Sequence, residues 1–152
     1  MNSQRDRRTA KERPQQDRLP PEPPTALSGA RVFLAEDEVM LLLALEDVLG
    51  ELGCKVVGTA TRVTEALAFV ASHSFDVAVL DGKLADGNID PVVEMLAARG
   101  TPFVLASGLA QSDFTQGFGN AVVLQKPYTD ADLRQSLLLA LAQGPAQRRS
   151  RL

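Results

Sequence analysis

The sequence predicts an α/β fold in which five parallel strands form one sheet with helices on both faces. Short apolar runs without a helical period alternate along the chain with segments whose apolar residues recur every three or four positions. Strands that alternate with helices form parallel sheets with right-handed crossovers. In such sheets the ligand site lies beyond the carboxyl ends of the strands.

Five segments have the composition of buried strands. Each is short and has apolar residues, mainly Val, Leu, Ala or Phe, without a helical period. The expected strands are residues 32–35, 54–59, 76–80, 101–106 and 121–124.

The first two helices follow from apolar spacing and capping residues. Residues 39–52 carry a leucine stripe, and Gly53 is the expected C-cap. Thr61 is the expected N-cap of the second helix, which runs to about Ser72.

The remaining helices are indicated mainly by their ends. Asp90 and Pro91 are the expected N-cap and first residue of a helix that ends at Gly100. Residues 108–120 contain several glycines, so any helix there is expected to be short or irregular. Thr129 is the expected N-cap of the last helix.

Composition divides the chain into a body and two tails. Residues 1–29 are rich in Arg, Gln, Pro and Glu and are expected to be disordered. Residues 30–143 are the expected globular domain, and 144–152 form a basic tail. Residues 31–141 hold seven Lys/Arg against fifteen Asp/Glu, and an acidic body argues against a nucleic-acid-binding surface.

The chain has no sequence feature that directs it to a membrane or out of the cell. No apolar run approaches the ~20 residues that span a bilayer, and the N-terminus has no apolar signal segment. The single cysteine, Cys54, cannot form an internal disulfide. We therefore expect a cytoplasmic protein.

Polar side chains follow four of the five predicted strands. Glu36 and Asp37 follow the first, Asp81 the third, Ser107 the fourth and Lys126 the fifth. Crowded carboxylates repel unless a cation lies among them, and oxygen ligands suit Mg²⁺. A carboxylate can attack phosphorus, a lysine can neutralise charge on the transferred group, and a hydroxyl can hydrogen-bond it.

Four segments at these strand ends carry a family resemblance. They are Phe-Leu-Ala-Glu-Asp-Glu at 33–38, Asp-Val-Ala-Val-Leu-Asp at 76–81, Leu-Ala-Ser-Gly at 105–108 and Gln-Lys-Pro-Tyr at 125–128. Together they closely resemble response-regulator receiver domains, over nearly the whole globular part. The resemblance implies the strand order 2-1-3-4-5.

The resemblance also implies a role for each acidic residue. Asp81 would be the phosphoacceptor for a histidine kinase or a histidine phosphotransfer protein. Asp37 would bind Mg²⁺ directly, Glu36 would bind it directly or through water, and Asp81 and the backbone carbonyl of Lys83 would complete the site.

Other residues match the family in part. The resemblance implies that Ser107 and Lys126 bind the phosphoryl group and that a cis peptide precedes Pro127. Val123 stands where many receivers carry an aromatic switch residue, and Ala85 replaces the usual proline.

Residues 102–108 are similar to the signature of a receiver subgroup nicknamed "FAT GUY", single-domain regulators associated with alphaproteobacterial kinases. Leu105 and Ser107 replace the Phe and Thr of that name, and Leu109 stands where an aromatic is expected.

We therefore expect a stand-alone response regulator that is not an enzyme. Only eleven residues follow Leu141, too few for a DNA-binding output domain. Such a chain could shuttle phosphate, drain it from a kinase, or bind a downstream protein when phosphorylated. The alternative is a pseudo-receiver that binds proteins without phosphorylation, although Asp37, Asp81 and Lys126 count against it. Glu36-Asp37-Glu38 fits neither a flavodoxin phosphate loop nor the Asp-x-Asp of haloacid-dehalogenase-like phosphatases.

Overall fold

Five parallel strands form the central sheet of the computed structural model, which describes residues 27–108 and 121–143. Their order is β2-β1-β3-β6-β7, so the chain starts inside the sheet and winds outward in both directions. The strands are β1 (Arg31–Ala35), β2 (Lys55–Ala60), β3 (Val77–Asp81), β6 (Phe103–Ser107) and β7 (Val122–Gln125). The predicted fold class and strand order are confirmed.

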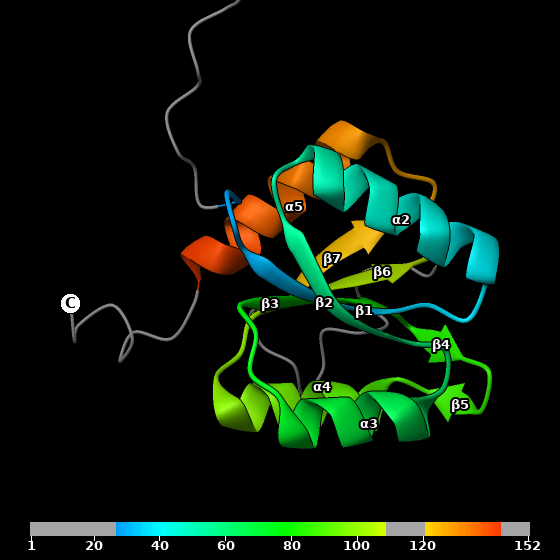
Figure 1. The fold of residues 1–152 in the computed structure, drawn as a ribbon. Coiled ribbons are helices and arrows are strands. Elements are labelled where there is room, and N and C mark those ends of the chain that lie inside the picture. The colour runs from blue at the N-terminus through cyan, green and yellow to red at the C-terminus, as the bar shows by residue number, and fades with distance from the viewer. Residues whose placement is uncertain (1–26, 109–120, 144–152) are drawn as a thin grey trace, which may run out of the picture.

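Two helices cover each face of the sheet (Figure 1). Helices α2 (Val39–Glu51) and α5 (Asp130–Ala142) lie on one face, and α3 (Val63–Ser72) and α4 (Asp90–Arg99) lie on the other. A layer of buried apolar side chains separates each helix pair from the sheet. Burial on both faces explains why β1, β3 and β6 are nearly continuous apolar runs.

Several predicted ends are confirmed. Helix α4 stops at Gly100, whose φ of 73° is the left-handed conformation that favours glycine. Thr129 caps α5 in a capping box: its hydroxyl accepts from the Asp132 N–H, and the Asp132 carboxylate accepts from the Thr129 N–H.

Three predicted caps are wrong by one position. Helix α2 has Leu52 as its C-cap, and Gly53 follows it with a φ of 93°. Helix α4 has Ile89 as its N-cap, so Asp90 is already helical, and its N–H donates to the Asn88 side chain.

The third wrong cap is at the start of α3, where Arg62 rather than Thr61 is the N-cap. The Thr61 hydroxyl and N–H both donate to Glu65, at 3.3 and 3.0 Å. The Thr61 hydroxyl therefore binds the side chain of Glu65, in the first turn of α3, and does not cap the helix.

Packing begins ahead of the expected domain start at residue 30. Leu27 is 1% exposed and belongs to the apolar layer under α2 and α5. The Gly29 N–H donates to the Gly53 carbonyl at 2.8 Å, which fixes this segment beside the end of α2.

A short antiparallel hairpin follows β3, in a segment for which the sequence patterns predicted no strand or helix. It consists of β4 (Lys83–Leu84) and β5 (Gly87–Asn88). Leu84 is 2% exposed and belongs to the apolar layer under α3 and α4, so the hairpin is anchored to the core.

The expected irregular segment 108–120 lies outside the described residues from position 109 onward, as do residues 1–26 and 144–152 of the expected tails. Within the part that the structure describes, no helix combines the length and the hydropathy needed to cross a membrane.

Candidate functional site

The predicted site residues gather at the carboxyl edge of the sheet. Glu36 and Asp37 follow β1, Asp81 ends β3, Ser107 ends β6 and Lys126 follows β7. Because these strands are neighbours and parallel, their carboxyl ends open onto the same edge.

Glu36, Asp37 and Asp81 form an acidic cluster in which one carboxylate oxygen from each residue lies within 4.8 Å of the others. Glu36 is 3% exposed, Asp81 is half-buried and Asp37 is exposed. The cluster therefore runs from the protein interior to the surface. Carboxylate oxygens at such spacing are a donor set that suits a hard divalent cation such as Mg²⁺.

Lys126 lies between two members of this cluster. Its Nζ is 3.5 Å from Oε1 of Glu36 and 3.5 Å from Oδ2 of Asp81. When all groups are ionised, three carboxylates and one ammonium leave a formal charge of −2, which a divalent cation would balance.

Burial is the main cause that raises the pKa of Glu36 to about 7. The Glu38 N–H, which donates to Glu36, and the Lys126 ammonium favour the carboxylate, while Asp81 disfavours it. Glu36 therefore binds a proton at a pH where an ordinary glutamate is ionised.

Opposing effects act on Lys126. Burial lowers its pKa, but Asp81 and Glu36 outweigh burial and hold the pKa above its ordinary value. Lys126 is therefore charged at neutral pH.

An open pocket of about 450 Å³ lies against the acidic cluster. One side of the pocket is the β4–β5 hairpin, and the other is formed by residues that follow β1 and β7. It is lined by Asp37, Glu38, Asp81, Lys83, Leu84, Ala85 and Lys126.

The other predicted residues lie close in the fold to this pocket. Ser107 is 5% exposed, and its carbonyl accepts from the Lys126 N–H at 2.8 Å. Lys83 is exposed at the start of the hairpin, and Val123 is half-buried in β7. The peptide bond between Lys126 and Pro127 is cis.

Sequence reasoning missed the contribution of the hairpin, which supplies Leu84 and Ala85 to the pocket. Strands of two residues have no hydrophobic period to detect. Asp86-Gly87 is a local turn signal, but the two central residues of the turn are Ala85 and Asp86, because Leu84 pairs with Gly87.

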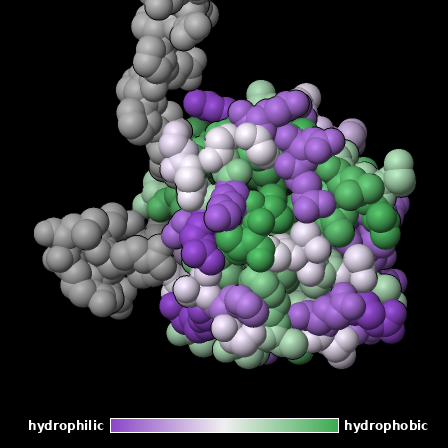
Figure 2. Space-filling view, in the orientation of Figure 1, coloured by the Kyte–Doolittle hydropathy of each residue, from purple (hydrophilic) through white to green (hydrophobic). Residues whose placement is uncertain are grey.

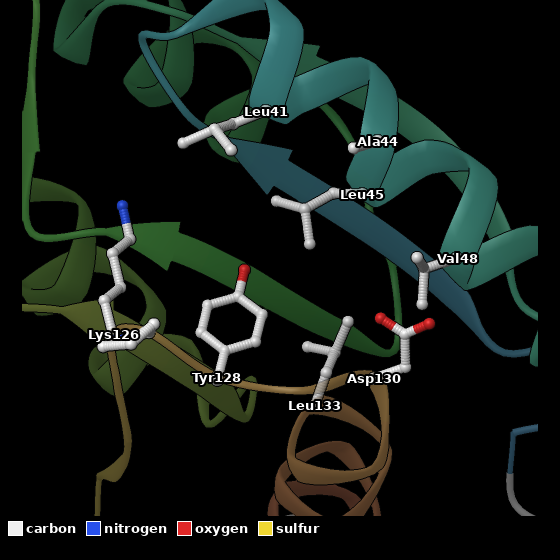
Figure 3. Close-up of a pocket in the computed structure, with 9 residues that line it drawn as sticks. Leu41, Ala44, Leu45, Val48, Lys126, Tyr128, Asp130 and Leu133 are labelled. Carbon is white, nitrogen blue, oxygen red and sulfur yellow. The ribbon is translucent and has the colours of Figure 1, made fainter.

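A second cavity, of about 440 Å³, lies between α2 and the start of α5 (Figure 3). Leu41, Leu45 and Val48 of α2 face Tyr128 and Leu133 across it, with Lys126 at one end. Burial raises the pKa of Tyr128, whose ring forms part of this lining.

Apolar side chains remain exposed on α2 beside this cavity. Figure 2 shows hydrophobic surface gathered over the first turns of α2. The exposed fractions are 58% for Val39, 78% for Met40, 41% for Leu41 and 51% for Leu43.

Proteins of known structure share this fold. SdrG from Sphingomonas melonis Fr1 is 37% identical, with a TM-score of 0.65, and the match covers 78% of this chain and 99% of SdrG. The receiver domain of the response regulator PhyR from Erythrobacter litoralis is 25% identical, with a TM-score of 0.67, over 79% of this chain and 95% of that domain.

A curated relative is the transcriptional regulatory protein PdtaR of Mycobacterium tuberculosis. It is 32% identical over 117 residues, which is 74% of this chain. The chain spans 57% of the length of PdtaR. No protein-family model matches the chain.

Proposed function

Because this chain belongs to the response-regulator receiver domains of two-component signalling, we propose that it accepts a phosphoryl group on Asp81. The donor would be a histidine kinase or a histidine phosphotransfer protein. The observation that supports this proposal best is the position of Asp81, 3.5 Å from the Lys126 ammonium and within the acidic cluster.

We infer that Glu36, Asp37 and Asp81 hold Mg²⁺, with the backbone carbonyl of Lys83 as a further ligand. The donor set supports this inference, because its oxygens lie within 4.8 Å of one another and a buried Glu36 retains a proton that a cation could replace. When bound, Mg²⁺ would supply positive charge that shields the carboxylates from the phosphoryl oxygens.

In the proposed reaction Asp81 is the nucleophile. One of its carboxylate oxygens forms a bond to phosphorus as the P–N bond of the phosphohistidine breaks. The imidazole leaves with the electron pair and then takes up a proton. Lys126 balances negative charge on the transferred group, and the Ser107 hydroxyl donates to one of its oxygens.

Phosphorylation would be sensed through Ser107 and Lys126. The Lys126 N–H donates a hydrogen bond to the Ser107 carbonyl. A movement of the backbone at the end of β6 would therefore also move the end of β7. Val123 lies in β7 without the aromatic ring that many receivers carry there, so we propose that the response relies on backbone movement.

The phosphorylated chain would act in the cytoplasm as a phosphate shuttle, a phosphate sink or a signal for a downstream protein. All three roles use the same chemistry at Asp81 and make the chain a signalling module rather than an enzyme. Membership of the FAT GUY subgroup stays a prediction.

Intact-protein mass spectrometry tests the proposal. After incubation with acetyl phosphate and Mg²⁺, the chain should gain the mass of one phosphoryl group, and Asp81→Asn should not. Labelling that is equal in both proteins would refute the assignment of Asp81. If neither acetyl phosphate nor a panel of phosphorylated histidine kinases labels the chain, it is a pseudo-receiver.

A further inference from the structure

The β4–β5 hairpin forms one side of the acidic pocket and begins directly after Asp81. Lys83, Leu84 and Ala85 all line the pocket. The base of the hairpin is closed by a hydrogen bond from the Ile89 N–H to the Gly82 carbonyl, at 3.1 Å. A displacement of the hairpin would therefore change both the shape of the pocket and the backbone next to Asp81.

The tip of the hairpin is attached to the start of α3, far away in the sequence. The Asp86 carboxylate accepts from the N–H of Val63 at 2.5 Å and from the N–H of Thr64 at 3.2 Å. In addition, the Ala85 N–H donates to the Thr61 carbonyl at 3.2 Å. These three hydrogen bonds connect the pocket wall to a helix that does not otherwise contribute to the pocket lining.

Asp86 is well suited to this attachment. The first N–H groups of a helix have no acceptor within the helix, and the helix dipole favours a negative charge there. The N-cap residue of α3, Arg62, makes no side-chain capping hydrogen bond. The Asp86 carboxylate thus caps α3 and at the same time attaches the hairpin to that helix.

We propose that Asp86 is a positioning residue for the acidic pocket: it holds the β4–β5 hairpin against α3 and thereby keeps Lys83 to Ala85 in place beside Asp81. The inference rests on the proposed function, because it assigns Asp86 a role in Mg²⁺ binding and phosphorylation at that site. Asp86 itself does not line the acidic pocket.

Two variants of Asp86 and one matched control test this role. Asp86→Ala removes both hydrogen bonds to α3, whereas Asp86→Asn keeps one side-chain oxygen as an acceptor. Asp76→Ala is the control, because the Asp76 carboxylate also accepts from a backbone N–H far away in the sequence, that of Arg31 at 2.8 Å, but precedes β3 at the sheet edge opposite the pocket.

The readouts are the Mg²⁺ dissociation constant by titration calorimetry, the rate of labelling by acetyl phosphate, and amide hydrogen exchange over residues 82–89. Asp86→Ala should weaken Mg²⁺ binding by about 10- to 100-fold, the range for groups that orient metal ligands. It should also slow labelling and speed exchange in the hairpin. Asp86→Asn should fall between Asp86→Ala and the parent, and Asp76→Ala should match the parent in Mg²⁺ affinity, labelling and exchange over residues 82–89.

Two results would overturn the role of Asp86. One is parental Mg²⁺ affinity and labelling in Asp86→Ala, which would make the residue a helix cap alone. The other is unchanged exchange over residues 82–89 in Asp86→Ala, which would show that the hairpin is held without it. A parent protein that neither binds Mg²⁺ nor is labelled would instead contradict the proposed function, and the exchange measurement would still test the attachment of the hairpin.

Discussion

At the scale of single residues, Glu36 is the carboxylate in the site whose charge is made unfavourable by burial. It is nearly fully buried beside Asp81, and the Lys126 ammonium only partly offsets the cost of its charge. Its pKa of about 7 lies above the ordinary value of 4.5. A cation in the cluster would favour the ionised form and displace that proton.

This shift makes the stability of the metal-free protein depend on pH. Between pH 4.5 and 7 the folded state binds more protons at Glu36 than the unfolded state does. The ionisation of Glu36 therefore lowers the free energy of unfolding as pH rises through this window. Glu36→Gln lacks this contribution, so the parent should lose stability relative to the variant as pH rises. Urea denaturation below pH 4.5 and above pH 7, without Mg²⁺, measures the difference.

Mg²⁺ should oppose this trend in the parent. Metal and proton compete for the same carboxylates, so Mg²⁺ should stabilise the parent more above pH 7 than below pH 4.5. Saturation at 100 times the dissociation constant would add about 2.7 kcal/mol to the free energy of unfolding. An equal gain at both pH values would show that Glu36 is not part of the metal site.

At the scale of secondary-structure elements, the sequence was informative where local signals decide the structure. The buried strands have continuous apolar runs, and Gly100 and Thr129 are local end signals. Strand ends also predicted which side chains meet, because parallel strands share one carboxyl edge.

Prediction failed where a distant residue decides the structure. The start of α3 is capped by Asp86, which lies 22 and 23 positions from the backbone groups that it binds. No pattern within α3 reports such a partner, so Thr61 was the best local candidate and was wrong. The hairpin was missed because each of its strands has two residues, and its position depends on burial of Leu84.

Close packing of α3 on β2 gives a prediction about stability. A Cβ at Gly58 would lie 2.3 Å from Cε2 of Phe69, whose ring is stacked on Phe33 with centroids 4.7 Å apart. Gly58→Ala should therefore destabilise the protein by about 1–3 kcal/mol in urea denaturation.

The control is Gly50→Ala in α2, where a Cβ would have no neighbour within 4 Å among the described residues. Because alanine has the higher helix propensity, this change should be neutral or stabilising by up to about 1 kcal/mol. If both substitutions had the same effect, Phe69 would not be packed on Gly58 as described.

At the scale of the whole molecule, the acidic pocket lies at the carboxyl edge of the sheet, where its lining residues follow the strands. Helix α2 begins at the same edge (Figure 1). Val39 and Met40 stand within four positions of Glu36 and Asp37, and Leu43 is about one helical turn further along α2. A protein that delivers a phosphoryl group to Asp81 must approach this edge. We therefore expect the apolar part of α2 to contact the phosphodonor protein.

If a protein donor contacts α2, a substitution there should slow transfer from a histidine kinase but not from a small phosphodonor. Leu43→Glu should reduce phosphoryl transfer from a histidine kinase that labels the parent, by at least about tenfold, because it places a charge in an apolar contact. Labelling by acetyl phosphate should be unchanged. Leu139→Glu is the matched control, since Leu139 is 48% exposed on α5 and Leu43 is 51% exposed on α2. Equal effects of the two substitutions would exclude α2 as the docking surface.

Locating the phosphoryl group on the labelled chain tests most directly whether Asp81 is the phosphoacceptor. Borohydride reduces an aspartyl phosphate to homoserine, and peptide mass spectrometry then identifies the converted residue. We expect homoserine at position 81, dependent on Mg²⁺ and on prior incubation with the donor. Conversion at Asp37 or another carboxylate, with Asp81 intact, would contradict it.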